Sequence, residues 1–140
     1  MVTIMKKENR FYSLVLPFFC LLFAVGNTYG DASETTRILN GTQITYMYSS
    51  GRSYNVKFEE KGVSYRYLTG SKPDVWWGPF PYQAMEVEDN LYFASWFEKG
   101  YGDYVTLLIN FDKNVIHGSA IIGGNEVHFH KAELVKFAKP

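Results

Sequence analysis

The sequence predicts one all-β domain, an antiparallel up-and-down barrel of about eight strands. Three observations predict it: apolar and polar residues alternate with a period of two in short runs, clusters of turn-forming residues separate these runs, and no stretch shows the period of a helix. Eight antiparallel strands close into a barrel that can hold one small ligand, and closure removes the exposed edges that promote aggregation.

The expected strands follow one another through short connections. Ser50-Gly51 joins the first two strands as a hairpin, and Asp89-Asn90 and Gly123-Gly124 mark later tight turns. Trp76 and Trp77 fall in a loop or strand entrance, where they would cover or plug the barrel end. The strands are expected at residues 38–49, 54–58, 63–69, 82–87, 91–97, 105–111, 115–122 and 127–137.

The N-terminal residues have the pattern of a secretory signal. Basic residues precede an apolar run over residues 11–25, and small or polar residues follow it. The run is shorter than the roughly 20 residues that a bilayer requires. We expect a signal peptide at 1–30, a flexible leader at 31–37 and the barrel at 38–140. The protein would then be exported, periplasmic or extracellular, with no stable membrane insertion after cleavage.

Charge and cysteine content exclude other classes of protein. The chain has 14 Lys plus Arg and 14 Asp plus Glu. Without Lys6, Lys7, Arg10 and Glu8 of the signal, the acids exceed the bases by two, so no basic field attracts nucleic acid. Cys20 lies inside the signal, so the exported chain can form no disulfide and depends on packing for stability.

Tyr46 and Tyr48 are the first candidate binding residues. Residues two apart on a strand point to the same face, so both phenols would project together. Such a pair can donate two hydrogen bonds to a carboxylate or carbonyl. Alternatively, both are ordinary strand aromatics with hydroxyls at the rim.

Glu98 is the candidate acid, because it shares a strand face with Trp96. If that face is inward, burial would raise the pKa of Glu98 toward the range useful for proton transfer. If it is outward, Glu98 is a solvated carboxylate. Arg66, on another strand, would neutralise Glu98 or a bound anion, or else be an exposed cross-strand charge.

The sequence lacks the residues that metal, nucleotide or hydrolase chemistry requires. His128 and His130 share a face of the last strand and His117 is a third histidine, but nothing completes a zinc site. The chain has no glycine-rich phosphate loop, no GxSxG elbow and no cysteine nucleophile after the signal. We therefore expect no metal and no cofactor.

Four segments together resemble the bacterial phenolic acid decarboxylases. They are TYMYSSGRSY (45–54), YRYLTG (65–70), YFASWFE (92–98) and NFDKNVIHG (110–118). The resemblance implies a calycin (lipocalin-like) barrel and cofactor-free release of carbon dioxide from hydroxycinnamic acids. The family's tyrosine pair falls on Tyr46 and Tyr48 and its glutamate on Glu98, whereas its arginine position holds Val75, just before Trp76. Arg66 is the cation that would substitute for it.

The chain also resembles a smaller MoaF-like group, named after a molybdenum cofactor biosynthesis protein. A Tyr-x-Ala-x-Glu-Val run at residues 82–87 and the strand around Trp96 carry this likeness. It implies the same barrel and a pocket, without an established reaction.

Three hypotheses follow for the function. The first is an exported barrel that binds a small organic ligand, aromatic or amphipathic, among Tyr46, Tyr48, Trp96 and Glu98, with Arg66 and Trp76 as further binding residues. The second is a decarboxylase-type lyase that uses Tyr46, Tyr48 and Glu98. The third is a structural module whose side chains fill the barrel. The sequence does not determine the oligomeric state.

Overall fold

The computed structural model describes residues 37–140. The predicted signal peptide and all but the last residue of the predicted leader lie outside the described residues. Within residues 37–140 there is no helix long and apolar enough to span a membrane.

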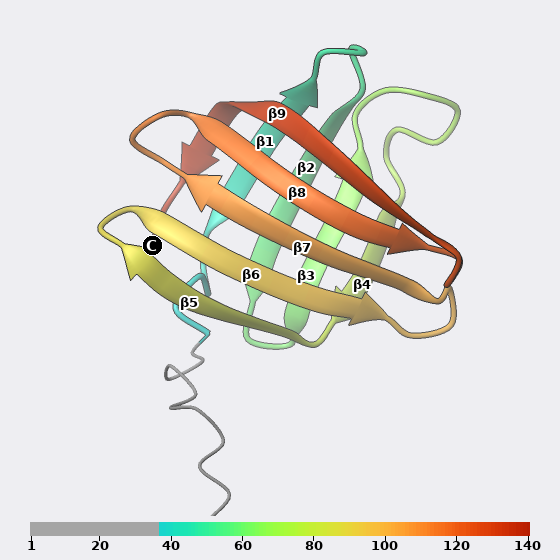
Figure 1. The fold of residues 1–140 in the computed structure, drawn as a ribbon, viewed down its shortest axis with the longest axis horizontal. Helices are drawn as coiled ribbons and strands as arrows, with labels where there is room; N and C mark the ends of the chain where they lie inside the picture. The colour runs from blue at the N-terminus through green and yellow to red at the C-terminus, as the bar shows by residue number, and fades with distance from the viewer. Residues whose placement is uncertain (1–36) are drawn as a thin grey trace, which may run out of the picture. The chain divides into compact units, whose positions relative to one another are not determined.

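The described residues form an all-β fold of nine antiparallel strands, as the alternating pattern predicts (Figure 1). Turn-forming residues at positive φ separate several of them, among them Gly51 and Asn90. The strands are β1 (Gln43–Tyr48), β2 (Ser53–Glu59), β3 (Gly62–Tyr67), β4 (Trp76–Phe80), β5 (Tyr82–Glu88), β6 (Leu91–Glu98), β7 (Asp103–Asn110), β8 (Val115–Ile122) and β9 (Glu126–Ala138).

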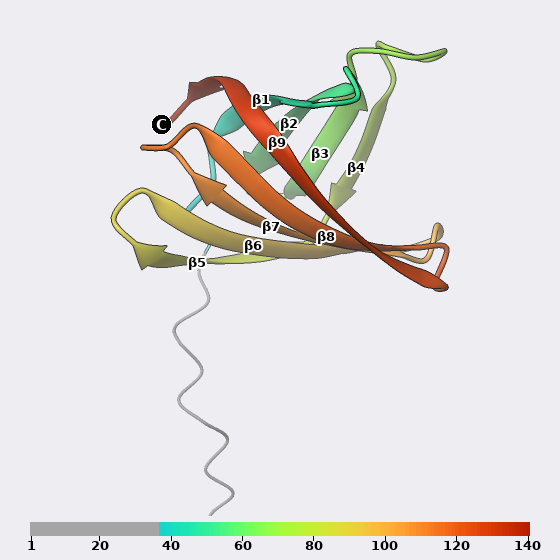
Figure 2. The same cartoon turned by 45° about the horizontal axis from the view of Figure 1, so that its top comes forward.

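The strands form one sheet that curls into a nearly closed barrel. Its order is β4-β3-β2-β1-β9-β8-β7-β6-β5, so strands consecutive in the chain pair with each other except β4 and β5, and β1 also pairs with β9. The sheet is open only between its edge strands β4 and β5, which are consecutive in the chain. Pro81 separates them and has no amide hydrogen to donate to a ladder. Figure 2 shows the two curved halves of the sheet, β1 to β4 and β5 to β9.

β4 is an additional strand, so the expectation of about eight strands is short by one. Trp76 and Trp77 belong to this strand and not to a loop. Gly78 and Pro79 hide the alternating pattern, but proline is tolerated in an edge strand. Gly78 has a φ of +106°, and a Cβ there would lie 2.6 Å from the carbonyl oxygen of Val63 on β3.

The first strand begins five residues later than predicted. Residues 38–41 form a turn, and β1 starts at Gln43. The apolar signal of this segment comes from Leu39, which is 2% exposed because it packs into the core. The turn is held by the amide of Thr42, which donates to the carbonyl of Leu39, and by Tyr82, whose hydroxyl donates to Asn40 Oδ1 at 2.6 Å.

The core fills the end of the barrel that this turn covers. Inward residues at alternate positions are fully buried there, for example Ile44, Phe58, Val63, Leu107 and Ile109. Burying such side chains contributes roughly 1.5–3 kcal/mol each. The opposite end, where β1 leads into β2 and β3 leads into β4, is lined by tyrosines.

Candidate functional site

Tyr46 and Tyr48 lie together on the inner side of β1. Tyr46 is 6% exposed, and its ring centre lies 5.5 Å from that of Tyr48. Burial, and next the neighbouring Tyr48, raise the pKa of Tyr46 well above its usual value. Burial likewise raises the pKa of Tyr48 to about 12. Both phenols are therefore neutral at physiological pH and able to donate hydrogen bonds.

Three more tyrosines from β2 and β3 continue this group. The ring of Tyr54 stacks on Tyr46 with centres 5.3 Å apart, and Tyr67 lies 5.0 Å from Tyr54. Tyr65 follows, with its ring centre 5.9 Å from that of Tyr67. We call these five residues the tyrosine cluster. It forms a continuous set of ring contacts across three neighbouring strands.

Glu98 lies at the end of the tyrosine cluster and is 3% exposed. Its Oε2 accepts a hydrogen bond from the hydroxyl of Tyr65 at 2.9 Å, and its Oε1 accepts one from Trp96 Nε1 at 3.0 Å. Burial raises the pKa of Glu98, while these two donors act in the opposite direction. No lysine, arginine or histidine of residues 37–140 forms an ion pair with Glu98.

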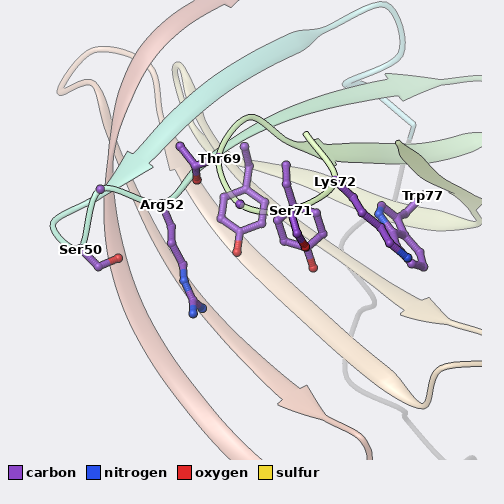
Figure 3. Close-up of a pocket in the computed structure, with 10 residues that line it drawn as sticks. Ser50, Arg52, Thr69, Ser71, Lys72 and Trp77 are labelled. Atoms are coloured by element: carbon purple, nitrogen blue, oxygen red, sulfur yellow. The ribbon is translucent and has the colours of Figure 1, made fainter. Parts of the chain in front are cut away.

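Two hollows open beside the tyrosine cluster at the barrel mouth. The first has a volume of about 540 Å³ and is lined by Arg52, Tyr54, Tyr67, Lys72 and Trp77, among others (Figure 3). Arg52 comes from the connection between β1 and β2, and Lys72 from the connection between β3 and β4. No aspartate or glutamate lines this hollow.

The second hollow, of about 700 Å³, shares Arg52 and Tyr54 with the first. It adds Tyr48 and His130, whose rings lie 5.1 Å apart, and it too contains no carboxylate. Arg52 also lies close enough to Tyr54 to lower that phenol's pKa, although burial has the larger, opposite effect. The mouth therefore combines aromatic rings, hydroxyls and cations.

The buried members of the predicted site do not line these hollows. Tyr46 and Trp96 belong to the core, and Glu98 is buried beside Trp96. Tyr46 contacts the mouth through the ring of Tyr54, and Glu98 is joined to it through Tyr65 and Tyr67. Trp96 lies between the apolar core and Glu98, because its ring is 6.4 Å from Phe58 while its Nε1 donates to the carboxylate.

Arg66 and Trp76 lie on the outer face of the barrel, away from the tyrosine cluster. Arg66 follows the inward-facing Tyr65 on β3 and pairs with Trp76 across the ladder. Its guanidinium is 5.0 Å from the Trp76 ring centre and 3.8 Å from Asp74. The structure thus does not bring Arg66 to Glu98, and Trp77 is the tryptophan that lines the mouth.

Two of the three histidines lie near each other, since His128 and His130 both line the second hollow. His130 faces inward against Tyr48, whereas His117 precedes the inward Gly118 and faces outward. In the described part of the chain, no three His, Cys, Asp or Glu side chains are grouped to hold a metal ion.

Sequence reasoning missed several residues of the mouth. Tyr54 lies two residues before the buried Val56, and Tyr65 and Tyr67 lie two and four residues after the buried Val63. This period-two spacing could have predicted that all three side chains face inward. Arg52 and Lys72 lie in connections, where no periodicity indicates the direction of a side chain.

The chain was compared with known proteins. A search of the curated proteins found no match. Among solved structures, the fold is similar to that of a provisionally named beta-lactamase from Burkholderia vietnamiensis, with a TM-score of 0.60 and 16% sequence identity over 69% of this chain and 92% of that one. At this identity the likeness concerns the fold alone.

The model of one protein family matches most of the chain. This model describes the MoaF N-terminal domain, and it matches residues 23–123. The match includes β1 to β8 and therefore the whole tyrosine cluster and Glu98. The chain belongs to the MoaF N-terminal domain family.

Proposed function

We propose that this chain is a binding protein for a small organic ligand that carries an aromatic ring and a negative charge. The observation that carries the proposal is the composition of the mouth. Two adjoining hollows are lined by tyrosines, Trp77, Arg52 and Lys72, and neither is lined by a carboxylate. The proposal includes export, which rests on the N-terminal sequence pattern.

The charge at the mouth favours an anion. Arg52 and Lys72 line a hollow that has aromatic walls of low dielectric constant and no carboxylate to neutralise their charge. Such an arrangement concentrates the field and attracts a ligand of opposite sign. A guanidinium can also hold a carboxylate through two parallel hydrogen bonds.

The aromatic walls favour a planar ligand. Trp77 and Tyr67 line the first hollow, and the neighbouring hydroxyls of Tyr54 and Thr69 can accept or donate hydrogen bonds. A volume of about 540 Å³ lies in the range of small-molecule sites. Binding is the first proposal because Glu98 lines neither hollow.

A lyase of the phenolic acid decarboxylase type is the second candidate, favoured by one observation. Glu98 is a buried acid whose pKa is raised and which is held by Tyr65. In this reaction the substrate carboxylate leaves as carbon dioxide, and a protonated Glu98 supplies the proton that replaces it on the alkene carbon. The proposal includes the calycin relationship that the sequence resemblance implies.

The test uses 4-hydroxycinnamic acid as the probe and its neutral methyl ester as the comparison. We expect calorimetry to show that the acid binds about tenfold or more tighter than the ester, the equivalent of about 1.4 kcal/mol. Arg52→Gln should abolish this preference. Arg66→Gln is the matched control, since it removes the same charge from the outer face and should leave both affinities unchanged.

Three results would decide against parts of this proposal. Loss of the probe's absorbance with formation of the vinylphenol identifies a lyase instead of a simple binder. Loss of binding in Arg66→Gln, with Arg52→Gln unaffected, moves the site to the outer face. Equal and undetectable binding of acid and ester removes the proposed ligand class.

A further inference from the structure

We infer that the outer face of β6 to β9 is the interface at which two copies of this chain form a dimer. β5 to β9 lie side by side as one layer in Figure 1, and no described element crosses their outer face. The inference does not depend on the proposed ligand, although Phe129 at the border of this face also lines the second hollow.

The outward side chains of this face form three rows that cross the strands. The first row, which includes the end of β6 and the start of β9, is apolar. Phe97, Tyr104, Ile121 and Val127 pair in sequence across β6, β7, β8 and β9. They point outward because they alternate with inward residues such as Trp96 and Ala120. Phe97 is 51% exposed, Tyr104 43% and Val127 59%. Four neighbouring apolar side chains in a row are unusual on the outer face of an isolated barrel.

The middle row carries hydroxyls. Ser95, Thr106 and Ser119 pair across β6, β7 and β8, and Phe129 completes the row on β9 at 84% exposure. Ser95 and Thr106 already satisfy each other, since their hydroxyl oxygens lie 2.9 Å apart. This row can therefore be covered without leaving those two groups unpaired.

The third row, on the other side of the hydroxyl row, is again largely apolar. Met85, Phe93 and Leu108 lie on β5, β6 and β7, and His117 follows on β8. A formal charge appears only where this row reaches Lys131 on β9. The outer face of β1 to β4 differs sharply, because it carries Lys57, Glu59 and Arg66.

The order of the rows makes the face complementary to itself. A two-fold axis that lies in the plane of the interface and crosses the strands at the row of Ser95 places that row on itself, with Phe129 on Phe129 of the other copy. The same axis places the row of Phe97 on the row of Phe93, and Lys131 is the one charged residue among these contacts. Closed two-fold dimers use the same patch on both copies, so self-complementarity is what such an interface requires. A membrane surface is a poorer occupant because the face lacks a basic rim.

The size of the face sets the expected affinity. Strands about 4.8 Å apart and rows about 7 Å apart give three rows across these strands a footprint of roughly 400–500 Å² per copy. Two copies would bury on the order of 1,000 Å², the lower limit for a specific interface. We therefore expect a dimer that dissociates at micromolar concentrations.

The test measures mass against concentration by sedimentation equilibrium on protein purified after expression of the full chain. We expect twice the chain mass at high concentration, with a dissociation constant that changes little when salt is raised, because Lys131 is the only formal charge in the three rows. Phe129→Glu should raise the dissociation constant at least about tenfold by placing like charges across the interface. Val75→Glu, at an exposed apolar residue beside β4, should leave it unchanged.

Either of two results would overturn the inference. One is a wild-type protein that stays monomeric up to about 1 mM, where even weak dimers form. The other is a Phe129→Glu protein that dimerises as well as the wild type. Circular dichroism checks that Phe129→Glu is folded, and if it is not, Val127→Lys replaces it in the same comparison.

Discussion

At the scale of single residues, Glu98 is subject to two opposing effects. Burial disfavours its charged form, and the hydrogen bonds from Tyr65 and Trp96 favour it. Burial is the larger effect, so the pKa of Glu98 is raised above its usual value of 4.5. A carboxyl whose pKa is raised on folding costs stability once it ionises.

We predict a specific pH dependence from this residue. The stability contributed by protonated Glu98 is fully present below pH 4.5 and is lost as pH rises through the raised pKa. Glu98→Gln removes this titration. The free energy of unfolding of wild type, relative to Glu98→Gln, should therefore fall with rising pH in denaturant titrations at a series of pH values. Glu60→Gln, at an exposed glutamate, is the control. Parallel curves for wild type and Glu98→Gln would contradict the prediction.

Tyr46 and Tyr48 allow a second prediction at this scale. Replacing both by phenylalanine keeps the two rings and removes both hydroxyls together, so neither is left without its partner. Because Tyr48 lines the second hollow, ligand affinity should fall in calorimetry while the melting temperature changes little. Tyr104→Phe, on the outer face, should bind as wild type does. Unchanged affinity in the double variant would show that the phenols only pack.

At the scale of elements, the contact between β3 and β4 sets the position of Trp77. The two strands approach so closely at Gly78 that no side chain fits between them. The alternation of β4 then places Trp77 inward at the mouth and Trp76 outward against Arg66. The absence of a side chain at Gly78 thus allows the close pairing of β3 and β4 that holds Trp77 opposite Tyr65.

A pair of glycine variants tests this packing. Gly78 and Gly70 both have positive φ, +106° and +101°, but only Gly78 faces backbone atoms of another strand. Gly70→Ala should cost about 1–2 kcal/mol of unfolding free energy from backbone strain alone. Gly78→Ala should cost roughly 3 kcal/mol or more, because β3 must also move. Equal losses in denaturant titrations would mean that the close approach contributes nothing.

At the scale of the whole molecule, the two ends of the barrel have different chemistry. The turn before β1 covers an apolar end, and the connections after β1 and β3 border a polar, tyrosine-lined mouth. The apolar end supplies stability, which leaves the mouth free to keep hydroxyls and cations around open space. This division suits a site for a ligand, since a barrel packed at both ends has no room for one.

A variant of Leu39 tests whether the apolar end of the barrel supplies stability without affecting the mouth. Its side chain is 2% exposed and completes the core beneath the turn. Leu39→Ala should lower the free energy of unfolding by about 2–5 kcal/mol through the lost burial and the cavity left behind. Ligand affinity at the mouth should not change as long as the protein is folded. Val87→Ala, at a residue 51% exposed, should change stability by less than about 1 kcal/mol. A loss of affinity in folded Leu39→Ala would show that the two ends are coupled.

Much of the fold follows from local pattern. The period of two predicts the strands, and the turn residues predict an antiparallel meander, which the structure confirms. The strand Trp76–Phe80 was not predicted because Gly78 and Pro79 break the alternating pattern. The first strand was predicted to begin too early because Leu39, a buried turn residue, has the same apolar character as a residue in a strand.

By itself, the sequence determined which side chains share a strand face: Tyr46 with Tyr48, and Trp96 with Glu98. Only the tertiary structure decided that Glu98 meets Tyr65, that Arg66 faces outward, and that Arg52 and Lys72 border one hollow. The physical reason is that alternation acts within a strand, whereas the inward side and the neighbours across the barrel are set by closure of the whole sheet.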